Sequence, residues 1–108
     1  MNKAEYDELQ QSVESIFTSL YMVDAGSLTP EQRKTHQEEL SAAYLAFIRL
    51  ENAHFADITD QAKKKLDTLA TRSRELQEQL TDLKKAKEIL EIVSGGLDVL
   101  KAIAELLK

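Results

Sequence analysis

Residues that interrupt helices are almost absent from this sequence. Its 108 residues include one proline and three glycines, and two of the glycines are adjacent, at Gly95 and Gly96. Because proline and glycine are the residues that helices tolerate least, the segments between them can form long helices. A content of 43% hydrophobic and 31% charged residues is typical of a folded domain. The sequence therefore predicts a single all-α domain over residues 1–108.

Apolar residues recur at helical spacing in four segments. In the first, Leu9, Val13, Ile16 and Leu20 follow one another at steps of four, three and four, which places them on one face of a helix. The third segment is rich in leucine, lysine, glutamate and glutamine, as coiled coils are. We expect helices at about residues 3–23, 30–57, 60–93 and 97–107.

Two of the expected boundaries have local signals. Thr29 can cap the second helix, Pro30 suits the first helical position, and Gln32 lies where the partner of a capping box belongs. At residues 58–60 the apolar stripe changes phase, which indicates either a tight turn or a stutter in one continuous helix. We favour the turn, because Thr59 can cap a new helix and a hairpin would bury both stripes.

These segments predict an antiparallel helical bundle or coiled coil of three long helices plus a short amphipathic C-terminal helix. At about 1.5 Å per residue the long helices would measure roughly 31, 42 and 50 Å, so the third would extend past the others. Its exposed end would carry apolar residues. Either the short helix, folding back at Gly95 and Gly96, or a second subunit could cover them.

The second helix carries an E-x-x-H spacing on its expected apolar face. Glu51 and His54 follow Leu40, Tyr44 and Phe47 at helical intervals. Four-helix di-iron proteins hold metal with this spacing, although they need further inward carboxylates that this chain does not supply. Local pairing of Glu51 with His54 and a lysine is a second explanation. The third is that these residues face a partner and contribute to specificity.

The C-terminal segment is the most hydrophobic part of the chain. It could dock on the third helix, bind a partner's groove or a second copy of the chain, or lie on a membrane surface. The residues that we predict to bind a partner lie in this segment, at the end of the third helix, and in the E-x-x-H pair. They are Leu83, Leu90, Val93, Leu97, Leu100, Ile103, Leu107, Glu51 and His54.

The net charge and the residue composition argue against several classes of partner and activity. A net charge of −5 disfavours nucleic acid as a partner, and the absence of cysteine excludes disulfides and thiolate metal sites. We expect no cofactor and no enzymatic activity, because no phosphate-binding loop or nucleophile motif occurs and His36 lies in a polar run that we expect to be solvated. No signal peptide or transmembrane segment is visible, which favours the cytoplasm.

The function that we expect is non-enzymatic binding of a partner protein, or self-association into an oligomer, as in an adaptor, chaperone or inhibitor. One alternative is a membrane-active protein that acts through its C-terminal helix. The second alternative is a metal-binding bundle that uses Glu51 and His54.

Overall fold

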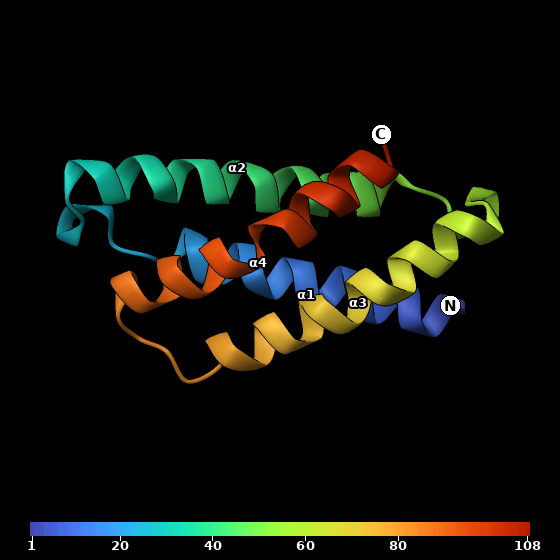
Figure 1. Cartoon of the computed structure of the whole chain (residues 1–108), viewed down its shortest axis with the longest axis horizontal. Coiled ribbons are helices and arrows are strands. Elements are labelled where there is room, and N and C mark those ends of the chain that lie inside the picture. The colour runs from blue at the N-terminus through green and yellow to red at the C-terminus, as the bar shows by residue number, and fades with distance from the viewer.

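A computed structural model describes all residues, 1–108, as a bundle of four α-helices. They are α1 (Lys3–Tyr21), α2 (Pro30–Asn52), α3 (Asp60–Leu80) and α4 (Ala86–Leu106), with short 3-10 turns η1 (Ala25–Ser27) and η2 (Phe55–Asp57). The prediction of an all-α helical bundle is confirmed. The bundle is elongated, with extents of 43 × 25 × 18 Å (Figure 1).

Each helix packs against two main neighbours. α1 lies between α2 and α3, and α4 also lies between α2 and α3, so that α2 and α3 occupy opposite corners. The chain reverses direction at each connection (Figure 1). Hydrogen bonds join Ser94 to Glu39 and Arg49 to Ala104, with the same sequence separation of 55 residues, so α2 and α4 run in the same direction side by side. The expected hairpin packing of the second helix against the third is therefore absent.

The helix starts follow their capping signals. Asn2 and Thr29 each form a capping box, with Glu5 and Gln32 respectively, and Pro30 is the first residue of α2. The Thr59 side chain accepts a hydrogen bond from the backbone N–H of Ala62 and caps α3. The predicted turn at residues 58–60 is thus confirmed.

Three of the predicted helix ends are wrong. α2 ends at Asn52 instead of residue 57, and α3 ends at Leu80 instead of residue 93. α4 begins at Ala86 and continues through Gly95 and Gly96, so it has 21 residues and is not a short helix. The break after Leu80 allows the following apolar segment to fold back as a helix of full length, where it buries its leucines instead of exposing them.

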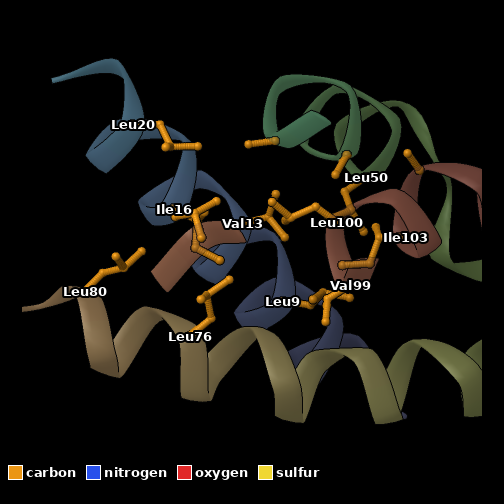
Figure 2. Close-up of a cluster of buried hydrophobic side chains, with 14 of the residues drawn as sticks. Leu9, Val13, Ile16, Leu20, Leu50, Leu76, Leu80, Val99, Leu100 and Ile103 are labelled. Carbon is orange, nitrogen blue, oxygen red and sulfur yellow. The ribbon is translucent and has the colours of Figure 1, made fainter. Parts of the chain in front are cut away.

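One hydrophobic core runs along the bundle and centres on α1. Leu9, Val13, Ile16 and Leu20 are all at most 1% exposed, which confirms the stripe predicted for the first helix. Figure 2 shows these side chains facing residues from the other three helices. Those partners are Leu50 of α2, Leu76 and Leu80 of α3, and Val99, Leu100 and Ile103 of α4.

The two adjacent glycines of α4 have different surroundings. A Cβ atom on Gly96 would lie 2.5 Å from Leu76 Cδ2, whereas a Cβ atom on Gly95 would meet nothing within 4 Å. Gly96 therefore allows α4 to approach α3 closely, with the buried Leu76 side chain against the helix backbone. No such packing constraint acts at Gly95, where glycine only weakens the helix.

Alanine substitutions at the two glycines separate helix propensity from packing. Gly95→Ala should raise the free energy of unfolding by about 1 kcal/mol, because alanine favours the helix interior. Gly96→Ala gains the same propensity but forces Leu76 to move, so its free energy of unfolding should lie about 1–3 kcal/mol below that of Gly95→Ala. Urea unfolding followed by circular dichroism measures both, and equal values would contradict the close approach at Gly96.

Candidate functional site

The predicted partner-binding residues of α4 lie mainly inside the bundle. Leu90, Val93, Leu100 and Ile103 are at most 4% exposed and belong to the core. The remaining three, Leu83, Leu97 and Leu107, are half-buried. Of the arrangements considered for the C-terminal segment, the structure has the docked one. A partner or a membrane could contact the four core leucine, valine and isoleucine side chains only if α4 left the bundle.

The E-x-x-H pair does not form the arrangement that its spacing suggests. α2 ends at Asn52, so His54 lies outside the helix and Glu51 and His54 do not share a helical face. Both side chains are exposed. No salt bridge joins Glu51 to a lysine, and the nearby Lys63 lies over the ring of Phe55 at 4.4 Å from its centroid. The expected placement of Glu51 and His54 on the inward apolar face of one helix is therefore wrong.

α2 carries two apolar faces, and the structure buries the one with smaller side chains. His36, Glu39, Ala43, Ala46 and Leu50 face the core and are at most 8% exposed. The face taken as inward from the sequence lies roughly 90° around the helix. It carries Leu40, Tyr44, Phe47 and Glu51, which are half-buried or exposed. Its large residues therefore lie along the outer side of the α1–α2 pair.

Four aromatic rings form a continuous surface on this side, which we call the aromatic surface: Phe17 and Tyr21 of α1, and Tyr44 and Phe47 of α2. The Phe17 ring lies at the centre, with centroid distances of 6.1 Å to Tyr21, 5.5 Å to Tyr44 and 6.2 Å to Phe47. The phenylalanines are half-buried, while Tyr21 is 69% and Tyr44 51% exposed. The sequence predicts Tyr44 and Phe47 in an apolar stripe that faces the core, whereas in the structure Tyr44 is exposed and Phe47 is half-buried.

The net charge is concentrated in the same half of the molecule. Residues 1–52 carry nine acidic and four basic side chains, whereas residues 53–108 carry ten of each. The whole net charge of −5 therefore belongs to the segment that contains α1 and α2. Glu14, one turn before Phe17, and Glu51, one turn after Phe47, are exposed and lie on the same helical faces as the aromatic rings. We call these two residues the acidic rim.

Three of the four basic residues of this half have polar contacts within the protein, and one of them, Arg33, lies on the same face of α2 as Glu51, about five helical turns earlier. Arg49 donates a hydrogen bond of 2.6 Å to the carbonyl oxygen of Ala104, and Arg33 donates one of 3.2 Å to that of Leu28. Lys3 lies 3.9 Å from Asp7. The three salt bridges of the structure involve Asp7, Glu8 and Glu105, so the acidic rim takes part in none of them.

A carboxyl group that the sequence analysis did not single out is buried between α2 and α4. Glu39 is fully buried; one of its oxygens accepts a hydrogen bond from the Ser94 hydroxyl, and the other has no hydrogen-bond partner. Burial raises the pKa of Glu39 from an ordinary value of 4.5 to about 7, with the Ser94 hydrogen bond opposing this rise and the charge of Glu38 adding to it. The carboxyl group therefore holds a proton well above its usual range.

Two further polar side chains are buried. His36, which we expected to be solvated, is 8% exposed, and its Nε2 lies 2.7 Å from the carbonyl oxygen of Leu20. It joins the start of α2 to the end of α1. The Ser73 hydroxyl of α3 is buried without a hydrogen-bond partner. A T-H-Q-E-E run gives no local indication that its histidine and second glutamate face inward, since both are polar.

The pKa of Glu39 makes stability depend on pH. In the window from about pH 4.5 to 7 the folded protein holds more protons than the unfolded chain, so the free energy of unfolding falls as the pH rises. The loss across this window should be on the order of 3 kcal/mol. Glu39→Gln retains the shape without the titration and should lack this loss.

Urea unfolding of both proteins at pH 5 and pH 8 measures the effect. Other groups that titrate in this window contribute to both proteins, so the difference between the two pH profiles belongs to Glu39. Parallel profiles for the original protein and Glu39→Gln would contradict the raised pKa.

A surface pocket lies away from the aromatic surface. It has a volume of about 660 Å³ and opens between the end of α1 and the connection from α3 to α4, where Met22, Leu80 and Leu83 line it together with polar side chains. Leu83, one of the predicted partner-binding residues, lines this opening.

Comparison of the chain with family models, curated proteins and solved structures finds no match. None of the four helices combines the length and the apolar character that crossing a membrane requires. The class of this protein is therefore defined by its own structure, as a four-helix bundle with an exposed aromatic surface.

Proposed function

We propose that this protein is a non-enzymatic protein-binding module and that the aromatic surface contacts its partner. The observation that carries this proposal is the exposure of Tyr21 and Tyr44, at 69% and 51%, beside the half-buried rings of Phe17 and Phe47. Single exposed apolar residues are common on proteins, but adjacent ones are typical of interaction sites. Tyrosine and phenylalanine are also enriched at protein interfaces.

The geometry suits an interface in two respects. Each tyrosine presents an apolar ring together with a hydroxyl group that can exchange a hydrogen bond with water for one with a partner. The Phe17 ring contacts both tyrosine rings, on helices whose other faces pack in the core. Side chains that are already ordered lose less conformational entropy when they bind, so more of the contact energy remains as affinity.

Replacing the two tyrosines by serine tests the proposal. The double variant Tyr21→Ser/Tyr44→Ser should lose binding to the cellular partner, because interface aromatic residues commonly contribute 2 kcal/mol or more, which is over tenfold in affinity. The thermal transition should change little, since both side chains are mainly exposed. Affinity purification from the native cell with quantitative mass spectrometry measures the retention of each partner.

The double variant Tyr21→Phe/Tyr44→Phe is the matched control, because it retains the rings. Partners of the aromatic surface should be retained by this variant and lost by the serine variant. Equal retention by the serine variant would reject this surface as the binding site. Light scattering of the purified proteins identifies self-association, which should then be lost in the serine variant alone.

A further inference from the structure

We propose that the occupant of the aromatic surface is a basic amphipathic helix of a different protein. This inference rests on the proposed function and adds to it the chemistry of the partner. It follows from three observations: the shape of the surface, the charge at the end where Glu14 and Glu51 lie, and the position of the exposed tyrosines.

The surface has the form of a shallow strip along two helices that run in opposite directions. On α2 it extends from Leu40 to Glu51, which is roughly 17 Å, or about three helical turns. A helix that lies along such a strip would contact it through apolar residues at positions i, i+3 or i+4, and i+7. Three turns provide three or four such anchors, which matches the number of rings that the strip exposes.

The acidic rim favours a partner with positive charge. Glu14 and Glu51 are exposed on the same helical faces as the rings, and neither is neutralised by a salt bridge within the protein. Lysine or arginine residues that flank the apolar stripe of a bound helix would lie beside these carboxylates. Pairs of this kind increase the association rate and favour the correct partner.

The same charges disfavour the other occupants of an apolar surface. Two copies of the chain that paired through the aromatic surface would bring four rim carboxylates together, with further acidic residues of α1 and α2 nearby. Nucleic acid and anionic membranes carry the same sign as this half of the molecule and are repelled. The opposite half of the protein, with ten acidic and ten basic residues, has no such preference.

The exposed tyrosines agree with this assignment. Tyr21, Met22, Tyr44 and Leu45 are the exposed large hydrophobic residues, and all four belong to the acidic half. Tyr21 and Tyr44 belong to the aromatic surface, whereas Leu45 lines a groove between α2 and α4, and Met22 lines the opening beside the connection from α3 to α4. A partner that contacts both the aromatic surface and the acidic rim would bind to α1 and α2 and leave α3 and α4 free.

A synthetic helix provides the probe. The peptide has about four helical turns, with leucine at the apolar positions, lysine elsewhere, and one tryptophan in the apolar stripe. Since the protein contains no tryptophan, all tryptophan emission belongs to the peptide. Its blue shift and anisotropy on titration with the protein give the dissociation constant. A scrambled peptide without the stripe and a peptide with glutamate in place of lysine are the controls.

Charge reversal at the rim should weaken binding of the lysine peptide. In Glu14→Lys/Glu51→Lys, both contacts change from attraction to repulsion, so we expect a loss of at least about tenfold, or about 1.4 kcal/mol. The matched control Glu78→Lys/Asp98→Lys makes the same change in net charge at exposed positions of α3 and α4. It should change the dissociation constant by less than about threefold. Circular dichroism checks that each variant is folded.

Three results would overturn the inference: no binding of the lysine peptide, equal binding of the glutamate peptide, or equal weakening by both charge-reversed pairs. The last would mean that total charge acts instead of the rim. The proposed function fails separately. Cellular partners that are lost with Tyr21→Ser/Tyr44→Ser but retained by Glu14→Lys/Glu51→Lys would reject the basic partner and support the aromatic surface, whereas partners that are indifferent to both would reject the surface itself.

Discussion

The close packing of α2 against α4 is the interaction that determines which parts of this protein face inward. The two helices run in the same direction, and the Ser94–Glu39 and Arg49–Ala104 hydrogen bonds hold them at a constant offset of 55 residues. Ala43 and Ala46, which are fully buried, form part of the contacting face of α2. Small side chains allow two helices to approach closely, but they leave no place for aromatic rings on that face. The large residues of α2 must therefore lie on its other side.

The buried carboxyl group of Glu39 is part of the packing of α2 against α4. Burying a charged group costs free energy, and burial therefore raises the pKa of Glu39 to about 7, so that the neutral form is favoured below this pH. Sliding α2 along α4 by one turn would separate the carboxyl group from the Ser94 hydroxyl and leave the buried carboxyl group without a partner. The hydrogen bond thus disfavours other registers of α2 along α4.

The sequence predicts those features of the fold that depend on neighbours along the chain. The caps at Thr29 and Thr59 and the stripe from Leu9 to Leu20 are confirmed because each depends on a few adjacent turns. The break after Leu80 has no proline or glycine, and it occurs where residues 86–106 can return along the bundle. The adjacent glycines, which usually end helices, continue within α4 because Gly96 provides space for Leu76. Both outcomes depend on contacts between distant segments.

The candidate site was only partly predictable for a related reason. α2 has two faces with comparable apolar character, and the sequence alone favours burial of the larger residues, Tyr44 and Phe47. The choice depends on α4, whose hydrophobic face supplies enough large side chains to fill the core against alanines. Once α4 is used in this way, the large apolar residues left exposed lie between Tyr21 and Leu45. Glu51, which is difficult to explain as an inward residue, is ordinary at the edge of an exposed surface. The separation of core and exposed surface follows from side-chain volume. The large side chains of α3 and α4 fill the core beside α1, so the large apolar residues on the outer faces of α1 and α2 remain exposed.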